Sequence, residues 1–153
     1  MKSILAPAFL AAAVSSSGTL PLSELQVGGI ASGAAEVDVV RQLGEPIRRV
    51  ETGEGTELHY PGLVVTVAWL EQQASGGERR VAALLGTDPH ACTPRGLCPG
   101  MPVAAANRLY GSPVVAQRET GDFLEYYPKA PGCWLQLSAA SGTIKSVAVA
   151  CQP

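Results

Sequence analysis

The chain has 153 residues, of which 46% are hydrophobic, 5% aromatic and 16% charged, and its formal net charge is -2. This apolar content excludes an intrinsically disordered chain, which combines low hydrophobicity with high charge. The near-neutral balance argues against a nucleic-acid partner, because such proteins carry a strongly basic surface.

Residues 1–17 are typical of a secretory signal peptide. Lys2 precedes an apolar run from Ile4 to Val14, and small residues follow as far as Gly18. This run is too short to cross a hydrocarbon core about 30 Å thick, which takes roughly 20 residues in a helix. The alternative is a buried N-terminal helix. We expect export to the periplasm or out of the cell, with no membrane insertion after cleavage.

Residues 18–90 are typical of a helix followed by an antiparallel meander. The helix is expected over residues 34–43, where Val37, Val40 and Leu43 form an apolar stripe. Alternating apolar residues separated by turn signals then predict strands at 47–51, 57–60, 63–69 and 80–85.

Residues 91–153 have the same order of elements. A helix is expected over 102–110, with Ala106, Leu109 and Tyr110 on its apolar face and Pro102 in its first turn. The predicted strands cover residues 114–118, 122–127, 133–137 and 144–151.

The two halves match each other at an offset of about 67 residues. The matching residues are those that fix backbone turns, namely Gly29, Gly33, Gly44 and Pro46 with Gly96, Gly100, Gly111 and Pro113. We expect the glycine after each helix to be left-handed and the proline beyond it to prevent continuation. We expect neither half to be stable alone at this size, so the pair should share a core. The sequence therefore predicts an α+β fold of two tandem helix-plus-antiparallel-meander repeats that share a core.

One segment resembles a superfamily of exported bacterial proteins. Residues 99–113, PGMPVAAANRLYGSP, look like the "PGM, helix, LG-x-P" signature of the β-lactamase-inhibitor-protein-like domains and of the SmpA/OmlA-type outer-membrane assembly lipoproteins. Residues 33–46 repeat it more loosely. Pro102 and Ala35 replace the usual Thr after Gly-Met. The tandem form without a lipid-anchor cysteine is similar to the inhibitor protein, which implies two sheets side by side forming a concave protein-binding surface.

The four cysteines predict disulfides, because an exported chain folds in an oxidising compartment. Three pairings are possible, and we favour Cys92–Cys98 and Cys133–Cys151. If the last two strands form a hairpin around residues 141–143, one register places Cys133 directly opposite Cys151. Directly opposed residues have the close Cβ separation that a disulfide needs.

The chain has two histidines, His59 and His90, which limits the possible chemistry. Neither lies in a nucleophile elbow, an HExxH motif or a Gly-rich phosphate loop. With Cys92 and Cys98 they could ligate a metal, but zinc sites usually contain more closely spaced cysteine pairs. We therefore expect no enzyme activity, no metal and no cofactor, and a small hydrolase is kept as an unfavoured alternative.

Protein binding has a firmer basis, because strand alternation gives each sheet a face turned away from its helix. In the second half this face carries aromatic and polar side chains, and His59 holds the matching position in the first. We predict that these residues bind another protein, as in an inhibitor or immunity-type factor: Phe123, Glu125, Tyr127, Trp134, Gln136 and His59. Two alternatives are that the rings cover a second core layer between the halves, and that the chain is a structural envelope component assisting assembly or cell-wall association.

Overall fold

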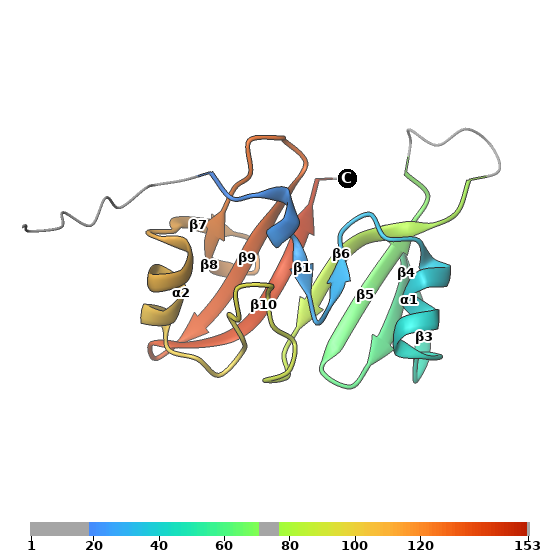
Figure 1. Cartoon of the computed structure of the whole chain (residues 1–153), viewed down its shortest axis with the longest axis horizontal. Coiled ribbons are helices and arrows are strands. Elements are labelled where there is room, and N and C mark those ends of the chain that lie inside the picture. The colour runs from blue at the N-terminus through green and yellow to red at the C-terminus, as the bar shows by residue number, and fades with distance from the viewer. Residues whose placement is uncertain (1–18, 71–76, 153) are drawn as a thin grey trace, which may run out of the picture.

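The structure is a computed structural model that describes residues 19–70 and 77–152. An 8-stranded antiparallel sheet has the order β3-β4-β5-β6-β10-β9-β8-β7, and the helices α1 and α2 lie against it (Figure 1). The elements are η1 (a 3₁₀ turn, Leu22–Glu24), β1 (Gln26–Val27), β2 (Ile30–Ala31), α1 (Glu36–Leu43), β3 (Arg48–Thr52), β4 (Gly55–Tyr60), β5 (Leu63–Ala68), β6 (Arg80–Gly86), α2 (Val103–Tyr110), β7 (Val114–Arg118), β8 (Gly121–Tyr126), β9 (Cys133–Ala140) and β10 (Thr143–Cys151). The expected α+β class is confirmed in its coarse form, a strand-dominated mixed fold. The predicted signal peptide lies outside the described residues.

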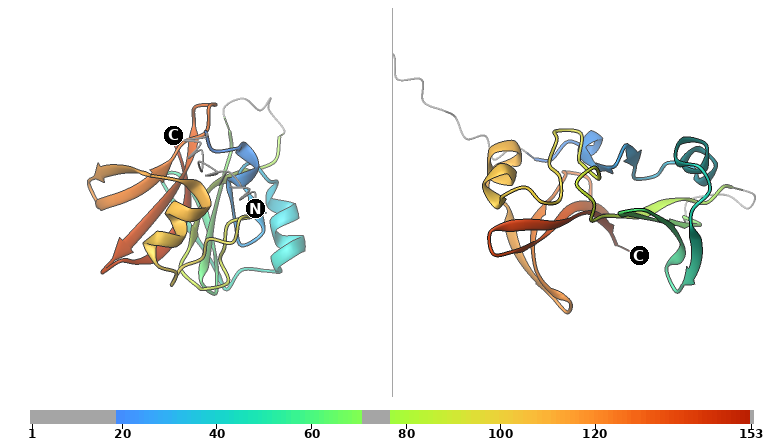
Figure 2. Two further views of the ribbon diagram at one scale, coloured as in Figure 1. Left: turned by 60° about the vertical axis from the view of Figure 1, so that its left-hand side comes forward. Right: turned by 90° about the horizontal axis from the view of Figure 1, so that it is seen from below.

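β6 and β10 join the two ends of the sheet. Ala148 of β10 pairs with Leu85 of β6, and the neighbouring pairs are Val147 with Gly86 and Val149 with Leu84. α1 precedes β3–β6 and α2 precedes β7–β10. The two helices therefore lie over opposite ends of the same sheet face (Figure 2). In the described ranges, no helix is long and apolar enough to cross a membrane.

The first helix begins later than expected, at Glu36, and its buried residue is Val39. Ala35 is extended, with φ -68° and ψ 143°, and forms an isolated bridge with Arg80, so α1 starts at Glu36. Val39 is 1% exposed, whereas Val37 is 53% exposed. Val37 is therefore wrongly placed in the expected stripe, whereas its last member, Leu43, packs against the core. The face that packs on the sheet follows positions 35, 39 and 43 at the helical spacing of four.

The second helix shows the same arrangement. Pro102 is the extended residue before α2, with φ -68° and ψ 150°, and bridges to Thr143, so it lies outside the first turn in which it was expected. Ala106 is fully buried and Tyr110 is 9% exposed, so these two members of the expected apolar face are correct.

A glycine with positive φ ends each helix, as expected. Gly44 has φ 83° and ψ -173°, and Gly111 has φ 85° and ψ -163°. These ψ values lie outside the left-handed helical region that we predicted. They fall in an extended region with positive φ that is essentially restricted to glycine.

The segment before α1, to which the sequence assigned no element, covers the junction between β6 and β10 on the helix side (Figure 2). β1 and β2 form a two-stranded hairpin there. Val27 is fully buried and Ile30 is 2% exposed. The N–H of Gly28 donates a hydrogen bond to the carbonyl of Cys92 at 3.0 Å. This hairpin therefore belongs to the core.

Tyr110 fastens α2 to two segments that precede it in the chain. Its hydroxyl lies 2.7 Å from Glu24 Oε2 and 2.6 Å from Thr93 Oγ1. Burial raises the pKa of Tyr110 well above its ordinary value. The Arg95 side chain lies over the Tyr110 ring, and its Nε is 3.4 Å from Glu24 Oε1. The buried carboxylate of Glu24 therefore has both a hydroxyl donor and a cation beside it.

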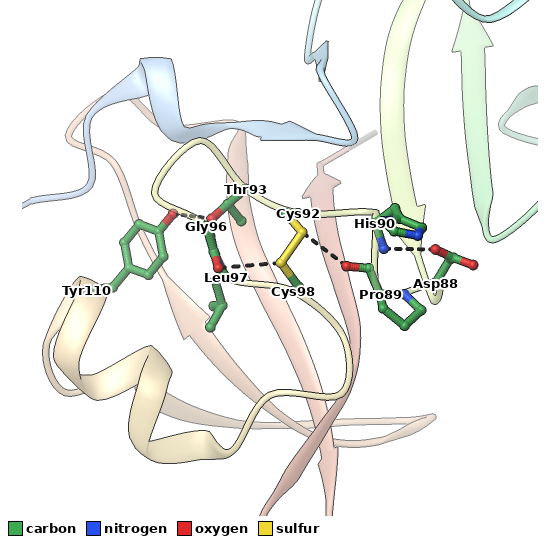
Figure 3. The surroundings of a disulfide bond; sticks show 9 residues. All are labelled: Asp88, Pro89, His90, Cys92, Thr93, Gly96, Leu97, Cys98 and Tyr110. Atoms are coloured by element: carbon green, nitrogen blue, oxygen red, sulfur yellow. Dashed lines mark hydrogen bonds between the residues drawn. A yellow bond between two sulfur atoms is a disulfide. The ribbon is translucent and has the colours of Figure 1, made fainter.

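Both expected disulfides are present in the structure. Cys92 is bonded to Cys98 in the linker between β6 and α2, next to the contact between Thr93 and Tyr110 (Figure 3). Cys133 pairs with Cys151 across β9 and β10 and is bonded to it, as the predicted register requires.

Candidate protein-binding site

The sheet face turned away from the helices is concave. Figure 2 shows both ends of the sheet, at β3–β4 and at β7–β8, bending away from the helices. Among the residues that the structure describes, no element covers this face. Among the described residues, Tyr127 is 40% exposed, and the buried core includes neither Tyr127 nor Trp134. The buried core of the described residues lies between the sheet, the helices and the N-terminal segment.

One row of paired residues crosses this face from edge to edge. It runs through Arg48, His59, Val64, Leu85, Ala148, Gln136, Glu125 and Val114. Near its middle, Leu85 is 42% exposed beside the small side chain of Ala148. The middle of the concave face therefore carries an exposed apolar side chain beside a small one.

Glu125 is fully buried although its strand position points to this face. Its Oε1 accepts hydrogen bonds from Arg118 Nη2 at 2.5 Å and from the Tyr127 hydroxyl. Its Oε2 accepts from Trp134 Nε1 at 2.9 Å and from Gln136 Nε2 at 2.6 Å. A buried carboxylate is tolerated when it is paired and hydrogen-bonded, and here four donors satisfy it. We call these five residues the Glu125 cluster.

The cluster keeps its central carboxylate ionised. Burial by itself would raise the pKa of Glu125, but its hydrogen bonds, led by the one from Arg118, bring that pKa below its ordinary value. The same hydrogen bond raises the pKa of Arg118. Burial and the contact with Glu125 raise the pKa of Tyr127. At neutral pH the cluster therefore contains an ion pair and a protonated phenol.

The outer part of the cluster is accessible. The Arg118 guanidinium lies 5.3 Å from the centre of the Trp134 ring, and the Tyr127 and Trp134 ring centres are 6.1 Å apart. Tyr127 is 40% exposed, and the Arg118 side chain is 41% exposed. Cation–π and tilted ring contacts of this kind hold large side chains in fixed positions. The cluster therefore presents ordered Tyr, Trp and Arg surfaces to solvent.

The structure brings together most of the residues predicted for this site. Trp134, Tyr127 and Gln136 meet around Glu125, and Phe123 lies partly buried on the same face of β8. Glu125 itself is buried, so it holds its neighbours in place and does not present its carboxylate to a partner.

His59 is the predicted residue that the structure separates from the others. It lies on β4, and the sheet order places five strand spacings between β4 and β8, which is about 24 Å. Its Nε2 is buried without a hydrogen-bond partner and lies 3.5 Å from Glu57 Oε1. His59 therefore belongs to the opposite end of the concave face.

Arg118 is the member of the cluster that sequence reasoning missed. The register needed to find it comes from the structure, in which a two-residue turn between β7 and β8 pairs Arg118 with Gly121. That register puts positions 118 and 125 on the same face of the sheet.

The structure does not form the alternative metal site that would combine Cys92 and Cys98 with the two histidines. Cys92 and Cys98 are bonded to each other, so neither can act as a thiolate ligand. His90 lies in the turn that follows Asp88, where its backbone N–H donates to Asp88 Oδ1 at 2.8 Å (Figure 3). In residues 19–70 and 77–152, no group of three or more His, Cys, Asp and Glu residues is placed to hold a metal ion.

The fold and this face define an α+β protein built on one curved antiparallel sheet with an open side. No known protein family matches the chain. No curated protein matches it either.

Two solved structures resemble it in fold. An extracellular protein containing a SCP domain from Bacillus anthracis str. Ames is 13% identical with a TM-score of 0.52, and the match covers 99% of this chain but 49% of that one. This chain thus spans about half the length of that protein. A DUF4309 family protein, YjgB, from Bacillus subtilis subsp. subtilis str. 168 is 15% identical with a TM-score of 0.51, over 90% of both chains.

Proposed function

We propose that this chain is an exported protein-binding module, an inhibitor or immunity-type factor that acts through the concave, helix-free face of its sheet. The Glu125 cluster is the observation that carries the proposal. Trp, Tyr and Arg are the residues most enriched among those that dominate binding energy at protein interfaces. The cluster presents all three in a hydrogen-bonded arrangement. Pre-ordered side chains lose little conformational entropy on binding.

Export is supported by the two disulfides. Such bonds form and persist in oxidising compartments and are rare in the cytosol. Both pairs use cysteines that are close in sequence, at separations of 6 and 18 residues. The extracellular nature of the SCP-domain protein with a similar fold agrees with this proposal.

We further propose that the concave face is built from two copies of one helix-and-meander module, as in the inhibitor-protein superfamily that the sequence resembles. Matched hydrogen bonds support the duplication. The Tyr60 hydroxyl donates to the Gly44 carbonyl at 2.9 Å, and the Tyr126 hydroxyl donates to the Gly111 carbonyl at 2.9 Å. In each half, a tyrosine from the second strand of the meander thus caps the helix that precedes it. Burial raises the pKa of Tyr126 to about 12, so this hydroxyl remains a donor at physiological pH.

The test compares variants on the two sides of the sheet. Trp134→Ala and Tyr127→Ala should each weaken binding of the partner by about 30-fold or more, the effect of removing a dominant interface residue. Val37→Ala is the matched control, because Val37 is exposed on α1 at the other side of the molecule. A photo-crosslinking residue at position 127 identifies the partner, with the same residue at position 37 as its control.

A second variant keeps the test decisive if the aromatic substitutions unfold the chain. Leu85→Asp changes an exposed side chain in the middle of the face and leaves the Glu125 cluster intact. It should also weaken binding while the circular dichroism spectrum is unchanged. Crosslinks that form equally well from positions 37 and 127, or full binding by Leu85→Asp and Trp134→Ala, would contradict the proposal.

A further inference from the structure

The two edge strands of the sheet, β3 and β7, differ in the side chains that they expose to solvent. Within the part of the chain that the structure describes, β3 and β7 are the edges of the sheet, and each presents one row of backbone donors and acceptors that no other strand pairs. β3 carries the charges of Arg48, Arg49 and Glu51, and charged side chains are a common means of preventing edge-to-edge pairing. β7 lacks this protection over its first three residues, Val114 to Ala116.

The apolar side chains of β7 are exposed on both faces of the sheet. Val114 is 53% exposed on the concave face, and Val115 is 66% exposed on the helix face. α2 therefore does not cover this edge. The one charged residue of β7, Arg118, lies at its end and is held against Glu125.

We propose that β7 pairs antiparallel with β7 of a second copy of this chain, so that the sheet continues from one protomer into the next. The register that the side chains favour puts Val115 opposite its own copy and Val114 opposite Ala116 on both sides of the two-fold axis. Every central pair is then apolar, and no like charges face each other. Cross-strand pairs of this kind stabilise a sheet, whereas directly opposed like charges destabilise it.

A comparable junction already exists inside the chain. β6 and β10 join the two ends of the sheet through three antiparallel residue pairs, with apolar side chains on both faces.

A two-fold axis perpendicular to the sheet would also leave both concave faces on the same side of the dimer. Two binding faces on one side permit bivalent engagement of a partner that displays two sites.

Self-association is tested by sedimentation across a dilution series. We expect the wild-type chain to reach twice the mass of one protomer, and Val115→Lys to remain a monomer. Val37→Lys is the control, because it adds the same charge at a similarly exposed position on α1. It should associate like the wild type. A wild-type chain that stays monomeric at every concentration overturns the proposal, as does a dimer that Val115→Lys leaves intact.

Cysteine crosslinking tests the register. In the proposed dimer the two copies of position 115 have Cα atoms about 5 Å apart, within disulfide reach. The two copies of position 117 have Cα atoms about 14 Å apart, because each lies opposite position 113 of the other strand. Under mild oxidation Val115→Cys should form covalent dimers and Gln117→Cys should not, with both native disulfides intact by mass spectrometry. If Gln117→Cys links as efficiently, the pairing is wrong. These outcomes do not depend on whether Trp134 binds a partner.

Discussion

At the residue scale, the candidate site depends on one acidic side chain that sequence alternation places on an outward face and the structure buries. Its donors come from β7, β9 and the residue after β8. An isolated carboxylate in this position would be strongly unfavourable, so the donors and the acid have to be present together. The accessible rings are therefore positioned by a group that does not itself contact solvent.

Replacing Glu125 by Gln preserves its shape and removes its charge. The free energy of unfolding at pH 7 should fall by about 1–3 kcal/mol, because hydrogen bonds to charged groups contribute more than neutral ones. The pKa of Glu125 in the folded chain lies below its ordinary value of 4.5. Its ionised form therefore stabilises the fold fully above that value, and this stabilisation is lost as pH falls through the lowered folded pKa.

Urea unfolding at pH 7 and pH 3 measures both effects. The wild type should lose more stability on acidification than Glu125→Gln does. Glu54→Gln, in the exposed turn between β3 and β4, is the control and should follow the wild type. Parallel pH profiles for the wild type and Glu125→Gln would show that the buried carboxylate does not stabilise the fold through its charge.

At the element scale, the glycines that end the helices are expected to be indispensable. Gly44 and Gly111 have positive φ in a region that other residues adopt at a cost of about 1–3 kcal/mol. A Cβ added at either position would meet no atom within 4 Å. The cost of Gly→Ala is therefore a backbone cost, and it should be similar at the two positions if the halves are copies of one module.

Gly53→Ala is the matched control, because Gly53 also has open space around it but lacks a positive φ. It should leave stability unchanged or raise it by a few tenths of a kcal/mol, since alanine restricts the unfolded chain. Thermal unfolding compares the three variants. A neutral Gly111→Ala would show that its backbone conformation is not strained for alanine.

Most elements could be predicted from local patterns, and the errors have physical causes. Apolar alternation and the Gly and Pro positions were sufficient for the strands of the large sheet. The α1 face was misplaced because EVDVV offers two apolar stripes, and the bridge from Ala35 to the sheet selects the one that contains Val39. The β1–β2 hairpin has two residues in each strand, too few to show a period. The burial of Glu125 depends on donors from other strands, which local patterns do not contain.

At the scale of the whole molecule, the two ends of the sheet are held together by more than the pairing of β6 with β10. The N-terminal hairpin and the linker after β6 lie over this junction, and both approach Gly86. A Cβ built at Gly86 would lie 2.5 Å from Ala91 Cβ and 2.8 Å from Val27 Cγ1. The hairpin and the linker therefore require a glycine at this position of β6. The contact with Val27 joins segments that are distant in sequence, so it could not be read from local patterns.

This closeness predicts coupling between the hairpin and the sheet. Gly86→Ala should lower the free energy of unfolding by about 1–3 kcal/mol through overpacking. Val27→Ala should lower it by about 2 kcal/mol, because it removes two buried methyl groups. In the double variant the smaller side chain at 27 relieves part of the clash. The combined loss should therefore fall short of the sum by more than about 0.5 kcal/mol, the usual limit of additivity for separate sites.

Val67→Ala provides the matched comparison. Val67 is as fully buried as Val27, but it lies on β5 four residues beyond Leu63, the β5 residue that pairs with Gly86. Its loss should add to that of Gly86→Ala, because sites more than about 7–10 Å apart with no shared partner behave independently. Denaturant unfolding of the two double-mutant cycles gives both coupling energies. Strict additivity for Val27 and Gly86 would mean that the hairpin moves off the sheet at little cost, and the junction would then depend on strand pairing alone.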